Sequence, residues 1–171
     1  IPDAFHSFWI EFSVEIRVRI ILTDLDSKII AESVLRDPDF NDIDALMQEI
    51  YHQVEGMFQD SKIPEQKLLG IGFSLPGTTD KQTGLLKIAP NLMKRSIVKL
   101  RNVNFTKYES LFRLPLFIEN DANAAAMAEL TLGIAKAMKN LVFLSILSYG
   151  IGGAIVVGGN LYQGKNKRAG E

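Results

Sequence analysis

Residues 115–133 read PLFIENDANAAAMAELTLG, and this stretch decides the class of fold. Its apolar start, over 115–119, is typical of a strand, and the alanine-rich run over 122–132 favours a helix because alanine has the highest helix propensity. Gly133 then stands where helices commonly end. A strand that leads into a helix is the repeating unit of α/β proteins, so we expect an α/β fold with a mixed sheet.

Toward the N-terminus the pattern changes from helix to strand. Residues 14–23 alternate apolar and charged side chains, and residues 29–35 are rich in aliphatic ones. With a turn at 24–28 between them, these runs predict two or three antiparallel strands at the start of the chain.

Between these two regions one helix is indicated most clearly. Apolar residues recur at helical spacing from Ile43 to Phe58, and Asn41 is the expected N-cap. The elements predicted after it are a strand over 68–75, a hairpin with its turn at 80–84 and a short helix over 105–112.

Beyond Gly133, two further strands are predicted at 141–147 and 154–157, with a glycine loop between them. We expect the alanine-rich helix to cross from one lobe to another. The expected division is a first lobe over 1–120, an interlobe helix over 121–138, and an incomplete second lobe over 139–171. Because the chain begins with Ile and stops at a strand pair of the second lobe, we expect a piece of a longer protein.

The composition narrows the classes of function. Hydrophobic residues make up 47% of the 171 residues and the net charge is −1, which fits a globular chain and gives no sign of a nucleic-acid surface. The absence of cysteine excludes disulfides and thiolate metal sites within the chain, and it is compatible with a reducing cytoplasm. No apolar run is long enough to cross a membrane.

The first candidate for chemistry is Glu119-Asn120-Asp121, at the junction of strand and helix. Ligands of α/β proteins bind at the carboxyl ends of strands. A carboxylate beside an amide can hold neighbouring hydroxyl groups, because the carboxylate accepts while the amide both donates and accepts. The alternative is that Asp121 only caps the helix, and position alone does not decide between the two.

Glycines mark the other two candidates. Gly77 follows a predicted strand end, where a backbone without a side chain can lie against a ligand, although Pro76-Gly77 also suits a simple turn. The run 150–153, GIGG, could turn successive N–H groups into one concavity that suits a phosphate. A tight hairpin between two strands is the alternative there.

Taken together, these features resemble the ROK (repressor, open reading frame, kinase) family. The blocks that carry the resemblance are GIGFSLPGTTD (70–80), IAPNL (88–92), IENDANAAAMAE (118–129), SYGIGGAIVVGGNLYQG (148–164) and AGE (169–171). The resemblance implies an actin-like, ribonuclease-H-like fold of two lobes around a cleft. Members of the family are sugar kinases or sugar-responsive transcriptional repressors.

The resemblance also implies roles for individual residues. The sugar-binding positions would be Gly77, Asn91, Asn120, Asp121 and Glu171. Gly150, Gly152 and Gly153 would form the phosphate loop of the second lobe. In a kinase member, Asp121 would be the general base, and ATP and Mg would be required. The zinc site of the family would lie beyond Glu171, so we expect no metal ligands within this chain.

One departure from the family pattern bears on function. Kinase members begin with a D-x-G-x-T loop, whereas residues 10–15 here read IEFSVE, without a glycine. Glu15 also adds a negative charge, which disfavours a phosphate. Repressor members have a similarly degenerate loop, often with Glu in place of the leading Asp.

Three functions therefore compete. The first is the effector module of a sugar-responsive repressor, in which a monosaccharide closes the cleft. The second is an ATP-dependent sugar kinase whose first loop has drifted, and the third is a scaffold that binds no sugar. The repressor interpretation implies a cytoplasmic homo-oligomer that contacts DNA only through a helix-turn-helix outside this chain. The residues that would select among glucose, xylose and N-acetylated hexosamines lie partly beyond Glu171.

Overall fold

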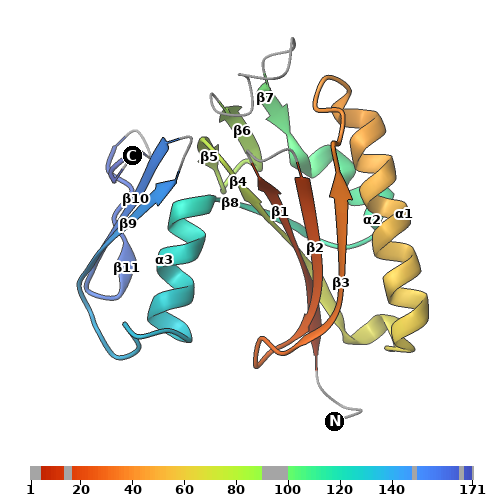
Figure 1. The fold of residues 1–171 in the computed structure, drawn as a ribbon, viewed down its shortest axis with the longest axis horizontal. Helices are drawn as coiled ribbons and strands as arrows, with labels where there is room; N and C mark the ends of the chain where they lie inside the picture. The colour runs from red at the N-terminus through yellow and green to blue at the C-terminus, as the bar shows by residue number, and fades with distance from the viewer. Residues whose placement is uncertain (1–4, 14–16, 90–99, 148–149, 166–167, 171) are drawn as a thin grey trace.

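The computed structural model describes residues 5–13, 17–89, 100–147, 150–165 and 168–170 (Figure 1). Its main element is a five-stranded sheet in the order β3-β2-β1-β4-β8. The strands are β1 His6–Ser13, β2 Arg17–Asp24, β3 Ile29–Arg36, β4 Leu68–Leu75 and β8 Leu116–Asn120. The first three pair antiparallel, whereas β4 runs parallel to both β1 and β8, so the mixed sheet is confirmed.

The opening of the chain differs from the prediction in one respect. The strand predicted over 14–23 starts only at Arg17, and Phe8–Ser13 belongs to a separate strand, β1, that pairs with it. Strands β1 and β2 both alternate buried apolar residues with more exposed ones, so the pattern alone did not show where the first strand ends and the second begins. Residues 14–16, between the two strands, lie outside the described part of the chain.

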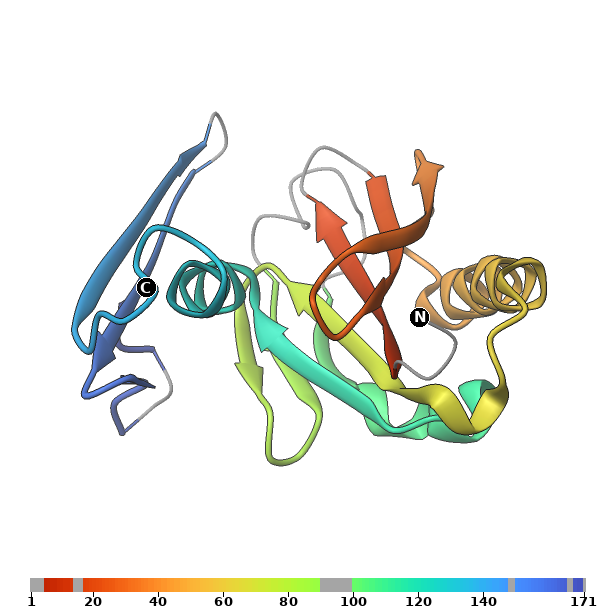
Figure 2. The same ribbon diagram turned by 90° about the horizontal axis from the view of Figure 1, so that it is seen from below.

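Helix α1, Ile43–Ser61, covers the sheet at β2 and β3 (Figure 2). Its N-cap is Asp42, whose side chain accepts a hydrogen bond from the Ala45 N–H at 2.9 Å. The prediction of Asn41 as the cap was wrong by one residue. The backbone N–H and side-chain amide of Asn41 instead both donate to Asp39 Oδ1, at 2.8 Å each.

Replacing Asp42 by Ala should destabilise the protein by about 1 kcal/mol, because the first turn of α1 loses its side-chain acceptor. Urea denaturation of the full-length protein measures this loss. Asn41→Ala is the matched control, and it should have the smaller effect. A larger loss for Asn41→Ala than for Asp42→Ala would show that the cap is assigned to the wrong residue.

The core lies between the sheet and α1, and aromatic rings fill one end of it. The ring centroid of Phe73 lies 5.1 Å from that of Phe105, and both rings lie 6.2–6.3 Å from Phe12. Phe105 begins the short helical segment predicted over 105–112, which consists of η3 Phe105–Tyr108 and α2 Glu109–Phe112. The short 3-10 turn η1, Glu65–Lys67, precedes β4.

Two smaller sheets complete the described structure. Strands β5 Thr78–Asp80 and β6 Leu85–Ile88 form the hairpin that was predicted with its turn at 80–84. Strand β7 Arg101–Asn104 pairs with β6 and adds a third strand to this sheet. The other sheet contains β9 Leu141–Leu147, β10 Gly150–Val157 and β11 Asn160–Leu161.

Helix α3, Asp121–Thr131, stands between the five-stranded sheet and the β9–β11 sheet (Figure 1, Figure 2). It contacts β4 and β8 on one side and β9 and β10 on the other. This position is the one expected of an interlobe helix, while the exact division into 1–120, 121–138 and 139–171 stays a prediction. In the described part of the chain, no helix is both long and apolar enough to cross a membrane.

Candidate functional site

The candidate site forms where two parallel strands end side by side. In the β4–β8 pairing, Leu75 is opposite Asn120, so both strands reach the same edge of the sheet together. The chain leaves β4 through Pro76-Gly77 and leaves β8 directly into α3. This arrangement brings Gly77 and Asn120 together although 43 positions separate them in the sequence.

Asn120 joins these two segments. Its Nδ2 donates to the Gly77 carbonyl oxygen at 2.9 Å, and its Oδ1 accepts from the Asn123 N–H at 3.0 Å. The side chain is therefore the N-cap of α3, and the residue is only 5% exposed. The cap that the sequence suggested at Asp121 belongs to Asn120, which leaves the Asp121 carboxylate available for another role.

Asp121 occupies the first turn of α3 and is half-buried. Burial raises the pKa of its carboxyl above the usual value, and the negative charge of Glu11 raises it further. The backbone N–H groups of Ala122 and of Asp121 itself oppose these effects, and the Ala122 N–H donates to Asp121 Oδ1 at 2.9 Å. A carboxylate with a raised pKa is a good acceptor for the proton of a hydroxyl group.

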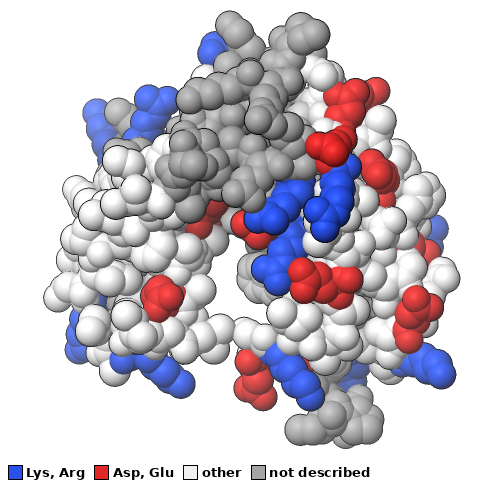
Figure 3. Space-filling view, in the orientation of Figure 1, with Lys and Arg blue, Asp and Glu red and all other residues white. Residues whose placement is uncertain are grey.

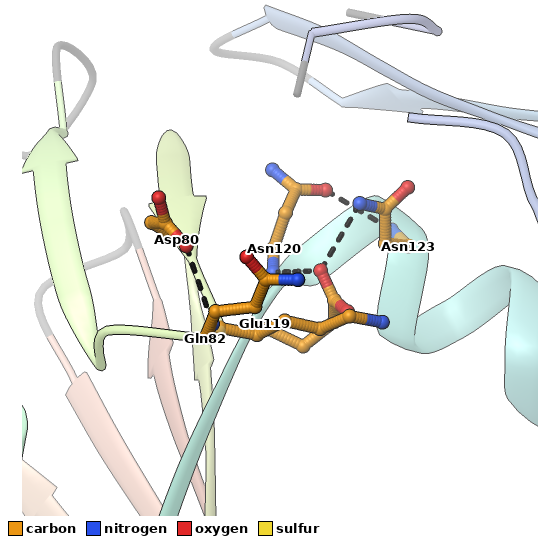
Figure 4. Close-up of polar contacts among 6 residues, drawn as sticks. Asp80, Gln82, Glu119, Asn120 and Asn123 are labelled. Carbon is orange, nitrogen blue, oxygen red and sulfur yellow. Dashed lines mark hydrogen bonds and ion pairs between the residues drawn. The ribbon is translucent and has the colours of Figure 1, made fainter. Parts of the chain in front are cut away.

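Glu119 is a member of the site to which the sequence pattern gave no separate role. Its Oε1 accepts from the Asn120 N–H at 3.0 Å and from Asn123 Nδ2 at 3.1 Å (Figure 4). Its other oxygen, Oε2, lies 3.8 Å from Lys81 Nζ on the β5–β6 hairpin. The signal that could have revealed it is a carboxylate at the end of a strand, directly before the Asn-Asp pair.

Gly77 holds a backbone conformation that other residues rarely adopt. Its φ is +108°, and a Cβ at this position would collide with the carbonyl oxygen of Ile88. The close approach of the two backbones leaves the Gly77 carbonyl pointing at Asn120. The simple-turn interpretation of Pro76-Gly77 is therefore incomplete, because the glycine also anchors the site.

The predicted glycine loop is a strand. Gly150, Gly152 and Gly153 lie in β10 and pair with β9, and none of them has a positive φ. Successive N–H groups of a strand point in opposite directions, so this conformation gives a phosphate concavity less support than a loop would, and the role of these glycines as a phosphate loop stays a prediction. Their small size serves packing, since a Cβ on Gly152 would lie 3.3 Å from that of Ala122 on α3.

Two of the predicted sugar-binding residues, Asn91 and Glu171, lie outside the described residues. The other three, Gly77, Asn120 and Asp121, lie together at the ends of β4 and β8. The space-filling view shows a hollow between α3 and the open face of the five-stranded sheet (Figure 3). Side chains of both signs lie on the sheet side of it (Figure 3). Among the described residues, no group of three or more His, Asp or Glu could hold a metal ion.

Comparison with known proteins finds relatives of this chain in one family. The model of the ROK family matches residues 15–171. The xylose repressor of Caldicellulosiruptor bescii is 30% identical over 154 residues, which are 90% of this chain and 37% of the repressor. The glucokinase of Halalkalibacterium halodurans is 38% identical over 104 residues, which are 61% of this chain and 30% of the glucokinase. The matched part of the chain thus spans about a third of each relative's length, 37% of the repressor and 30% of the glucokinase.

A solved structure supports the assignment of the fold. The ROK family glucokinase of Streptomyces griseus, in complex with glucose and AMPPNP, superposes with a TM-score of 0.77. The match covers 97% of this chain and 49% of the glucokinase, at 21% identity. The actin-like fold expected from the sequence is confirmed.

Proposed function

The chain belongs to the ROK family, and from this premise we propose that it is the sugar-binding effector module of a ROK-type transcriptional repressor. Asp121 would hold sugar hydroxyl groups, Asn120 would place it, and the backbone at Gly77 would line the pocket. Asn91 and Glu171 would complete the set of sugar contacts. The half-buried carboxylate of Asp121 among amide groups supports this proposal, since such groups suit neighbouring hydroxyls.

The sequence at the end of strand β1 is the observation that favours a repressor over a kinase. Where kinase members have a glycine-containing phosphate loop, this chain has Glu11 within a regular strand, paired with Arg19 on one side and Ser74 on the other. The charge of Glu11 acts on Asp121, so it is directed at the same site. The leading Asp of the kinase loop is a carboxylate as well, so the difference is the missing glycine: residues 10–15 contain none, whereas a nucleotide phosphate needs the free N–H groups of such a loop. Glu15, the second predicted negative charge, lies outside the described residues.

The extent of similarity also favours the repressor. The match to the xylose repressor spans nearly the whole chain, while the match to the glucokinase spans less of it.

In this proposal the sugar acts by population shift. A monosaccharide would bridge a first lobe (1–120) and a second lobe (from 139) across the interlobe helix, and it would stabilise the closed form. It can change the repressor only if it binds the closed form better than the open one. The whole protein would be a cytoplasmic homo-oligomer that contacts DNA through a helix-turn-helix outside these 171 residues. No cofactor is required in this function.

The second candidate is an ATP-dependent sugar kinase, and the raised pKa of Asp121 is the observation that favours it. A carboxylate with a raised pKa is suited to remove the proton from an attacking hydroxyl group. ATP and Mg would then be required, with the phosphate predicted near Gly150, Gly152 and Gly153. The strand conformation of these glycines gives that prediction less support than the sequence did.

A calorimetric titration of the full-length protein separates the two candidates. Xylose, glucose and N-acetylated hexosamines are titrated first, and Mg·ATP is then added to each saturated sample. We expect heat from one sugar and none from Mg·ATP, with or without sugar. Nucleotide binding that depends on a sugar, together with a phosphorylated product, would replace the repressor with the kinase. A protein that binds no sugar would exclude both.

A further inference from the structure

Resting on the proposed sugar site, we propose that Glu119 is a positioning residue that fixes the orientation of the Asn120-Asp121 pair without touching the sugar. Three segments that meet at the site converge on its carboxylate: the end of β8, the first turn of α3 and the turn of the β5–β6 hairpin (Figure 4). Glu119 is not among the residues that the family resemblance implies as sugar-binding, so its role is a separate proposal.

The hydrogen bonds around Glu119 form a closed network. Oε1 accepts from the backbone N–H of Asn120 and from the side-chain amide of Asn123. The backbone N–H of Asn123 in turn donates to Asn120 Oδ1. Because Oδ1 is engaged in this way, the amide of Asn120 must direct Nδ2 toward the Gly77 carbonyl. Glu119 thus helps to set which way the Asn120 amide faces and where α3 begins.

The position of Asp121 depends on the same network. Asp121 is the first residue of α3, so its backbone direction is set by the cap at Asn120. Two hydrogen bonds converge on Glu119 Oε1, one from the residue that caps α3 and one from the first turn of the helix. Loss of this acceptor would release the Asn123 amide and loosen the first turn, which displaces the Asp121 carboxylate from the hydroxyl groups it holds.

The ion pair with Lys81 is the lesser part of the arrangement. The two charged atoms are 3.8 Å apart, and the Lys81 side chain is 52% exposed. Exposed pairs of this kind contribute little because water screens them and the lysine loses rotamer freedom. The positioning therefore comes from the acceptor oxygen rather than from the charge. This distinction predicts that glutamine, which keeps an acceptor oxygen, can replace Glu119.

The test is the affinity of the full-length protein for D-xylose and D-glucose, and for the deoxy analogues of each, by calorimetry. Glu119→Ala should weaken binding of the preferred sugar by about 10-fold, whereas Glu119→Gln should stay within about 3-fold of wild type. Lys87→Ala is the matched control on the same hairpin, since Lys87 pairs with Asp80 and not with Glu119. It should bind as wild type does.

The deoxy analogues separate positioning from a general loss of structure. In the wild-type protein, one missing hydroxyl group should weaken binding most, because Asp121 holds it. In Glu119→Ala the penalty for that hydroxyl should shrink, while the penalties for the others stay unchanged. A uniform loss for every analogue would mean that Glu119 only stabilises the fold, and this would overturn the inference.

Two further results would also overturn it. Glu119→Ala could bind as tightly as wild type, or Glu119→Gln could be as weak as Glu119→Ala, which would assign the effect to the charge. A wild-type protein that binds none of the sugars would instead overturn the proposed function, and this inference with it. The two failures are therefore distinguishable by the behaviour of the wild type.

Discussion

Asp121→Asn should abolish the stabilisation of the protein by sugar while leaving the sugar-free protein at least as stable at neutral pH. The carboxylate is the group proposed to accept hydrogen bonds from sugar hydroxyls, and its loss should weaken binding by about 100-fold or more. The same carboxylate is half-buried near Glu11, so its charge is unfavourable in the folded protein without ligand. Asparagine has nearly the same shape and can still accept from the Ala122 N–H.

The raised pKa of Asp121 also predicts how the stability difference between Asp121→Asn and the wild type changes with pH. Because the pKa of Asp121 is raised in the folded protein, its favourable contribution is fully present below the ordinary carboxyl pKa and is lost as the pH rises through the raised value. At neutral pH the wild type therefore carries an unfavourable charge that Asp121→Asn removes. The gain in Tm of the variant over the wild type should grow between about pH 4 and pH 7.

Asp44→Asn is the matched control, because Asp44 also occupies the first turn of a helix but has the opposite shift. Hydrogen bonds from Lys107 and from the Tyr108 hydroxyl lower its pKa, so its contribution is present at neutral pH and is lost in acid. The Asn variant should then be the less stable one at pH 7, by a small amount because Asp44 is exposed. Thermal unfolding with and without sugar measures both variants. An Asp121→Asn protein that still binds sugar would exclude the proposed site.

The sequence located most elements of the fold because their patterns are local. Strand β4 matches the predicted 68–75 at both ends, since an apolar run is closed by Pro76-Gly77. The N-cap of α1 was missed by one residue because Asn41 and Asp42 are both good caps. Only the structure shows that Asn41 is already engaged with Asp39.

The site was harder to predict because it depends on which strands pair. The sequence marked Gly77 and Asp121 as candidates, but the Asn120–Gly77 contact follows from the parallel pairing of β4 with β8. The run 150–153 was taken for a loop because glycine is rare in strands. Its pairing with β9 and its close packing on α3 outweigh that propensity.

Gly77→Ala should be among the most damaging single changes in the described structure. At φ +108° an alanine is strained, and its Cβ would collide with the carbonyl oxygen of Ile88 at the end of β6. Strain and overpacking together should destabilise the protein by about 2–4 kcal/mol. Relief of the collision would move the Gly77 carbonyl away from Asn120, so sugar binding should fall even in the protein that remains folded.

Two other glycines separate the causes. Gly158 has a φ of +62° but open space around it, so Gly158→Ala should show the backbone strain alone, about 1 kcal/mol. Gly56 lies within α1 with nothing near its Cβ position, so Gly56→Ala should stabilise by about 0.5–1 kcal/mol. Denaturant unfolding and sugar titration of the three variants measure the series. If Gly77→Ala lost no more stability than Gly158→Ala and kept its sugar affinity, the close approach at Gly77 would play no part in the site.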